Sequence, residues 1–78
     1  MVNIINLFIM AQVNLMLKNV SGDTLNLELI DQYGGNFSDT LDADSSRNFS
    51  LNEGSDITVN GSVRFQVSLD MEGQELEV

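Results

Sequence analysis

The acidic stretch from Asp42 to Glu53 is the part of the sequence that comes nearest to a metal-binding pattern. Carboxylates stand at its first, third and twelfth positions, which is the ligand spacing of an EF-hand calcium loop. Arg47, however, occupies the sixth position, where that loop needs glycine for a sharp turn, and glycines rather than helices flank the stretch. The pattern therefore argues against an EF-hand. It leaves a looser calcium site at Asp39, Asp42 and Asp44, or a solvated acidic loop.

The composition excludes most types of catalytic site. The sequence contains no His and no Cys, so it offers no imidazole-dependent triad, thiolate nucleophile or His/Cys metal site. Carboxylates are plentiful, but nothing marks two of them as a catalytic pair. A glycosidase-type pair also needs a pocket that raises the pKa of one acid, and a chain of 78 residues rarely builds one. We therefore predict a protein that is not an enzyme and holds no cofactor.

The charge balance is strongly acidic, with 12 acidic residues, 3 basic residues and a net charge of −9. Lys18, Arg47 and Arg64 are scattered and cannot form a groove that follows a phosphate backbone, so direct nucleic-acid binding is not expected. Two interpretations of the acidity stay open. It keeps a small β protein soluble, or it attracts a basic protein by resembling the charge of nucleic acid.

The first nine residues are mostly apolar and carry no charge. They are too few to span a membrane, and no Lys or Arg precedes them, so neither a membrane span nor a signal peptide is expected. We expect 1–9 to be an extension that docks as a strand, either on the protein's own sheet or on the edge of a neighbouring subunit. The side chains predicted to bind the partner are Ile4, Ile5, Leu7, Phe8 and Ile9.

Apolar and polar residues alternate along most of the remaining chain, which is typical of half-buried strands. The alternation is clearest over 13–17 and 25–29, and turn-forming residues fill 19–23 between them. We predict that the two segments form a hairpin with a three-residue turn and a glycine bulge, because Leu17 and Leu25 must share a face.

Further strands are predicted over 37–41, with Phe37 and Leu41 inward, and over 47–51. The tail, 71–78, is predicted to be an edge strand whose glutamates discourage aggregation.

The Asn60-Gly61 pair is a strong hairpin signal that conflicts with the surrounding alternation. A two-residue turn there sets Val59 opposite Ser62 and places the apolar faces of the two strands on opposite sides. We therefore expect either a loop that is longer by one residue or a chain that passes from one sheet to another.

These patterns predict an all-β fold, a small antiparallel sandwich or barrel of six to eight short strands, with a single domain over 10–78 after the extension. A small core without disulfides favours association with other chains. We predict a non-catalytic interaction protein, a structural or decorating component of a larger assembly such as a virus or phage particle. Its partners would be other protein subunits, in the cytoplasm or in a particle assembled there. Two alternatives are an acidic inhibitor of a basic host protein and a calcium-dependent adhesion module.

Overall fold

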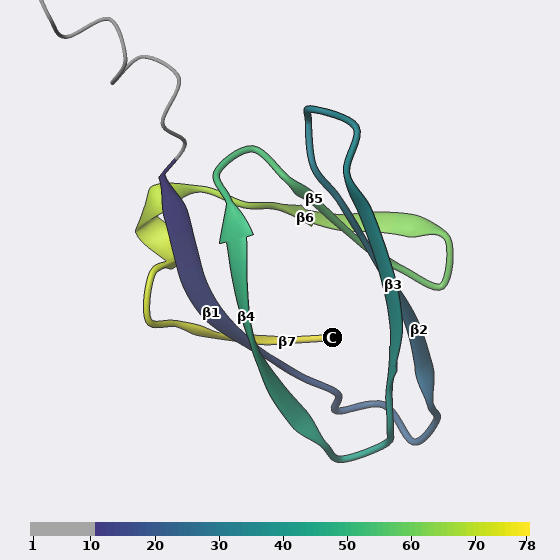
Figure 1. Ribbon diagram of the computed structural model, residues 1–78. Coiled ribbons are helices and arrows are strands. Elements are labelled where there is room, and N and C mark those ends of the chain that lie inside the picture. Colours follow the sequence, from purple (N-terminus) through teal and green to yellow (C-terminus); the bar gives the residue numbers. More distant parts are fainter. Residues whose placement is uncertain (1–10) are drawn as a thin grey trace, which may run out of the picture.

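The computed structural model describes residues 11–78 as two β-sheets packed face to face (Figure 1). The first sheet has the strand order β4-β1-β7 and the second the order β3-β2-β5-β6. A short 3-10 helix, η2 (Leu69–Met71), precedes the last strand. The strands are β1 (Gln12–Lys18), β2 (Leu25–Ile30), β3 (Asn36–Leu41), β4 (Ser46–Asn52), β5 (Asp56–Val59), β6 (Ser62–Gln66) and β7 (Glu75–Glu77). The predicted all-β sandwich of six to eight strands is confirmed.

The extension predicted over 1–9 lies outside the described residues. Within 11–78, no helix is long and apolar enough to cross a bilayer.

The core lies between the two sheets and consists almost entirely of Leu, Val and Ile. Period-two alternation along β1, β2 and β5 sends every second side chain into this space, and each fully buried one contributes about 1.5–3 kcal/mol. Half-buried aromatic and apolar side chains pack around its margin. The buried members are Val13, Leu15, Leu17, Leu25, Leu27, Leu29, Leu41, Ile57, Val59, Val67 and Val78.

The predicted hairpin between the first two strands is wrong. β1 pairs with β4 and β7, whereas β2 pairs with β3 and β5, so the two strands lie in different sheets. The connection 19–24 carries the chain from one sheet to the other. Leu17 and Leu25 still face one core, but they approach it from opposite sheets. Alternation fixes which face of a strand is buried and leaves its partner open.

Asn19 holds this crossing in place. Its side chain is fully buried, and its Nδ2 donates to the carbonyl oxygens of Asp23 at 2.7 Å and of Leu41 at 2.9 Å. Its Oδ1 accepts from the backbone N–H of Ser21 at 2.8 Å and from the Ser21 hydroxyl at 2.7 Å. The buried amide thus replaces the ladder hydrogen bonds that a hairpin would supply.

The Asn60-Gly61 segment forms neither the longer loop nor the crossing between sheets that was predicted. The turn has two residues, with φ of 50° at Asn60 and 87° at Gly61 as in a type I′ turn, and β5 and β6 remain in one sheet. The register then shifts by one, because Arg64 is an extra residue in β6. This bulge returns Phe65 to a position opposite Ile57, at the margin of the core.

The other predicted strands are present. The segments 37–41 and 47–51 fall inside β3 and β4, and the tail supplies the edge strand β7. β7 runs parallel to β1, so the first sheet is mixed, whereas the sandwich was predicted to be antiparallel.

The buried hydroxyl of Thr58 is expected to destabilise the fold. Its side chain is 5% exposed, and its Oγ1 has no hydrogen-bond partner among residues 11–78. Replacing it with the isosteric Val (Thr58→Val) should raise the free energy of unfolding by about 1 kcal/mol, because an uncompensated buried hydroxyl is removed. Thr40→Val, an exposed position on the same outer face, is the control, and chemical denaturation is the measurement. A lower stability for Thr58→Val than for the control would contradict the prediction.

Candidate functional site

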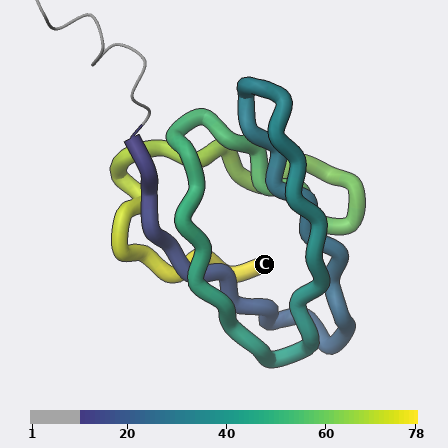
Figure 2. The backbone as a smooth tube through the Cα atoms, in the orientation of Figure 1, coloured from purple at the N-terminus to yellow at the C-terminus, as the bar shows by residue number. Residues whose placement is uncertain are grey.

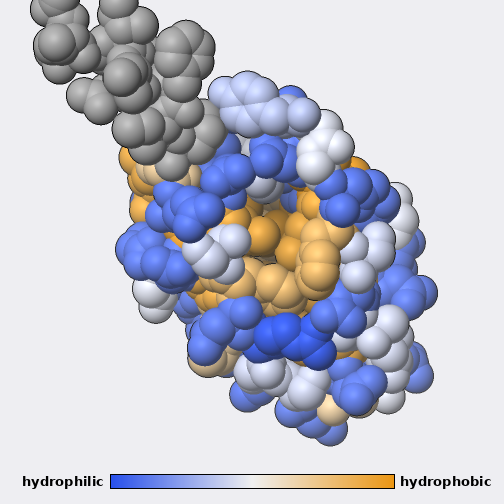
Figure 3. Space-filling model, viewed as in Figure 1, coloured by the Kyte–Doolittle hydropathy of each residue, from blue (hydrophilic) through white to orange (hydrophobic). Residues whose placement is uncertain are grey.

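An apolar groove opens between the edge strands of the two sheets. β3 and β4 are the outermost strands of their sheets and lie on the same side of the sandwich, because the turn 42–45 joins one directly to the other (Figure 2). The space between them, here called the lateral groove, has a volume of about 350 Å³. Its apolar lining consists of Leu29, Phe37, Phe49 and Leu51. Figure 3 shows this apolar surface inside a hollow with a hydrophilic rim.

The register of the strands explains why the groove is apolar. Phe37 pairs with Leu29 and Phe49 with Leu15, so both aromatic rings stand on the inward faces of their sheets. Edge strands have a neighbour on one side only, which leaves these rings incompletely covered. Phe49 is half-buried, and Phe37 is 54% exposed.

The prediction that Phe37 and Leu41 both face inward is therefore confirmed for Leu41, which is buried, but Phe37 does not join the core. The Phe37 side chain has the predicted inward orientation, but no strand beyond the edge strand β3 covers it among the described residues.

Polar contacts close both ends of the groove. At one end, an ion pair between Arg47 of β4 and Asp39 of β3 links the two sheets. At the other end, the Asn52 Nδ2 donates to the Asp31 Oδ2 at 2.9 Å. Both carboxylates at the groove are thus engaged in contacts that connect the sheets.

The ion pair is expected to contribute little stability. Its side chains are 43% and 40% exposed, and exposed pairs contribute about 0–1 kcal/mol. We expect Asp39→Asn to lower the free energy of unfolding by less than about 1 kcal/mol, and high salt to reduce the difference. Asp23→Asn, another exposed carboxylate, is the control in chemical denaturation. A larger loss that persists in high salt would contradict this prediction.

The outer edges of β3 and β4 carry no further strand in the part of the chain that the structure describes. Such an edge presents backbone N–H and C=O groups that can pair with another strand. Inward-pointing charges are one way in which proteins block an edge, and Arg47 and Asp39 do this at one end of the groove. The remaining length, beside Phe37 and Phe49, has no such protection.

The structure does not bring the three candidate calcium ligands together. Asp39 contacts Arg47, Asp42 accepts a long hydrogen bond of 3.5 Å from the Thr24 hydroxyl, and Asp44 sits in the connecting turn with φ of 61°. Across residues 11–78, no three acidic side chains are grouped so that they could hold a metal ion.

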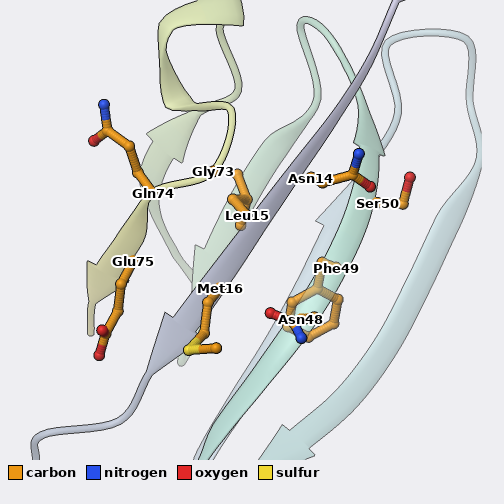
Figure 4. Close-up of a pocket in the computed structure, with 9 residues that line it drawn as sticks. All are labelled: Asn14, Leu15, Met16, Asn48, Phe49, Ser50, Gly73, Gln74 and Glu75. Atoms are coloured by element: carbon orange, nitrogen blue, oxygen red, sulfur yellow. The ribbon is translucent and has the colours of Figure 1, made fainter.

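A second, larger hollow of about 650 Å³ lies on the β4-β1-β7 sheet (Figure 4). Across its outer face, Met16 pairs with Asn48 on one side and with Glu75 on the other. The side chains of Gln74 and Glu75 extend away from β1. This hollow is a shallow surface of one sheet, lined by both polar and apolar side chains, and it shares Phe49 and Ser50 with the lateral groove.

The alternation pattern did not indicate the lateral groove, and the apolar N-terminal residues were predicted to be the docking segment instead. That segment, with Ile4, Ile5, Leu7, Phe8 and Ile9, precedes the described residues, so the structure gives it no position. The groove depends on which strands become edges, and alternation alone does not determine strand order. An aromatic residue at the start of the weakly patterned segment 37–41 was the available signal.

Comparisons of the chain with known proteins found no match. This holds for protein-family models, for curated proteins and for solved structures. The function is therefore inferred from the geometry of the groove and the chemistry of its residues.

Proposed function

We propose that the protein is a non-catalytic structural subunit that binds other protein chains through the lateral groove. The observation that carries the proposal is an apolar groove between two open strand edges, in which Phe37 is left 54% exposed. An exposed aromatic ring next to unpaired backbone is what an added peptide strand would cover.

An extended peptide fits this site better than a small molecule does. A strand laid between β3 and β4 would satisfy backbone groups along an edge and place alternate side chains on the apolar lining. The carboxylates of Asp31 and Asp39 contact Asn52 and Arg47, so both take part in contacts between the two sheets.

The setting that we propose is a larger protein assembly, such as a virus or phage particle, in the cytoplasm or built there. Two features support it. The net charge of −9 keeps the subunit soluble before assembly, and the small core lacks disulfide bonds that would stabilise the isolated subunit. Charge mimicry of nucleic acid and calcium-dependent adhesion remain predictions that no observation here favours.

A photo-crosslinking experiment tests this function. A benzophenone analogue of phenylalanine is placed at position 37 in the full chain, produced in the organism that encodes it. The matched control carries the same analogue at Val63, which is 63% exposed on the far edge strand β6. We expect position 37 to form one dominant adduct with a protein of the assembly, identified by mass spectrometry, and position 63 to form none. Equal adducts at both positions, or none at position 37, would refute the proposal.

A further inference from the structure

We propose that the occupant of the lateral groove is the N-terminal segment, residues 1–10, of a second copy of this chain. The inference rests on the proposed function and names its partner. Docking of one copy's segment in the next copy's groove would link subunits head to tail. Such contacts close into rings or continue as filaments.

The segment and the groove match in chemistry. Residues 1–10 comprise eight apolar residues and two asparagines, and none of their side chains is charged. The groove has an apolar lining, and its charged residues sit at its ends in contacts with other side chains. An uncharged apolar strand can therefore enter without leaving a buried charge unpaired, which a charged peptide could not do.

The lengths also match. β3 has 6 residues and β4 has 7, so their edges extend about 20–23 Å at roughly 3.3 Å per residue. The 8 residues from Val2 to Ile9 would extend about 26 Å as a strand. The segment is therefore long enough to cover the open part of the edge beside Phe37 and Phe49, and Met10 and Ala11 remain as a connection to β1.

The groove of the same copy is the poorer match, although Gln12 lines its end, because the segment would have to reverse its direction to enter it. The Ala11 carbonyl accepts a hydrogen bond of 2.9 Å from the Glu53 N–H, so the β1–β4 ladder continues to the first described residue. A return into the groove would need a reversal between Ile9 and Gln12, around the turn that follows β4. That stretch holds no Gly, Pro, Asn, Asp or Ser, the residues on which tight turns depend.

Strand periodicity assigns the faces of the docked segment. Ile5, Leu7 and Ile9 share one face with Asn3, and Asn6 lies on the other face between Ile4 and Phe8. We place the face with three successive apolar side chains, Ile5, Leu7 and Ile9, on the lining of the groove and Asn6 outside. An Asp substitution is therefore expected to weaken docking at Leu7 and to leave docking unchanged at Asn6.

The first experiment measures the mass of the full chain by sedimentation over a wide range of concentration. We expect association beyond the 8.6 kDa monomer, and Leu7→Asp should weaken it by about tenfold or more, whereas Asn6→Asp should leave it unchanged. On the groove side, Phe37→Ser should weaken association to a similar degree. Val63→Ser, at a site that is even more exposed, should not. A full chain that stays monomeric, or equal effects of Leu7→Asp and Asn6→Asp, would overturn the inference.

A mixing experiment separates exchange between copies from docking within one copy. The Leu7→Asp variant keeps an intact groove, and the Phe37→Ser variant keeps an intact segment. Each alone should be monomeric, and an equimolar mixture should give a dimer of about twice the monomer mass. A mixture that stays monomeric would refute docking between copies.

The failure of this inference is distinguishable from the failure of the proposed function. If the photoreactive analogue at position 37 captures a different subunit of the assembly while the purified chain stays monomeric, the groove still binds protein and this partner is wrong. If position 37 captures nothing, the groove itself is not a binding site.

Discussion

Replacing Asn19 with alanine is expected to lower the free energy of unfolding by about 3 kcal/mol. The substitution leaves the Leu41 carbonyl without the Asn19 donor and the Ser21 N–H without its acceptor, and the Asp23 carbonyl keeps only the Ser21 hydroxyl, at 3.0 Å. Each buried group left unsatisfied costs about 1–3 kcal/mol. A domain of 78 residues is stable by roughly 8 kcal/mol at about 0.1 kcal/mol per residue, so the loss is a large part of the total.

Chemical denaturation monitored by circular dichroism measures this effect. Asn48→Ala is the matched control, because Asn48 is exposed on the outer face of β4, and its change should stay within about 0.5 kcal/mol. Equal midpoints for the two variants would show that the crossing between the sheets does not depend on the Asn19 amide.

Removing residues 75–78 is expected to cost about 4 kcal/mol, roughly half of the stability of the chain, and to lower its midpoint of thermal unfolding strongly. The deletion takes away the buried Val78 and the half-buried Leu76, and it uncovers Leu17 beside them. It also removes the parallel β1–β7 ladder and two further backbone hydrogen bonds that tie the tail to β1 and to the loop after it. They join the Val78 N–H to the Lys18 carbonyl at 2.8 Å and the Val20 N–H to the Val78 carbonyl at 2.9 Å.

The dispersion of amide signals in NMR spectra and the thermal unfolding curve report this loss. The control is the double variant Glu75→Gln and Glu77→Gln, which keeps the strand and removes only exposed charges. It should fold with a stability within about 0.5 kcal/mol of the original chain. A truncated chain that unfolds cooperatively near the original midpoint would show that β7 is dispensable.

The sequence predicted the strands better than their partners. Alternation of Val13, Leu15 and Leu17 with polar neighbours identifies a half-buried strand wherever it pairs, so the fold class followed directly. The pairing of β1 did not follow, because a turn-rich connection suits a hairpin and a crossing between sheets equally well. The deciding residue was Asn19, whose buried hydrogen bonds have no signature in the sequence pattern.

Local exceptions to alternation were also beyond prediction. The extra residue at Arg64 lets a two-residue turn coexist with an inward Phe65, and a bulge of this kind is visible only once the pairing is known. The exposed lining of the groove likewise depends on strand pairing. Phe37 was predicted inward from its spacing to Leu41, but its exposure depends on β3 being an edge strand.

The pairing of β1 has a consequence for biosynthesis. Gln12 contacts Asn52, 40 positions later, and Asn14 contacts Glu72, 58 positions later. A nascent chain therefore emerges from the ribosome with its first described strand unpartnered, and it cannot complete the sheet around that strand until β7 has been translated. Chains dominated by such distant pairings fold slowly and expose apolar strands meanwhile. The interval before β7 is translated is accordingly the stage at which the chain is most prone to misassembly and most in need of a chaperone.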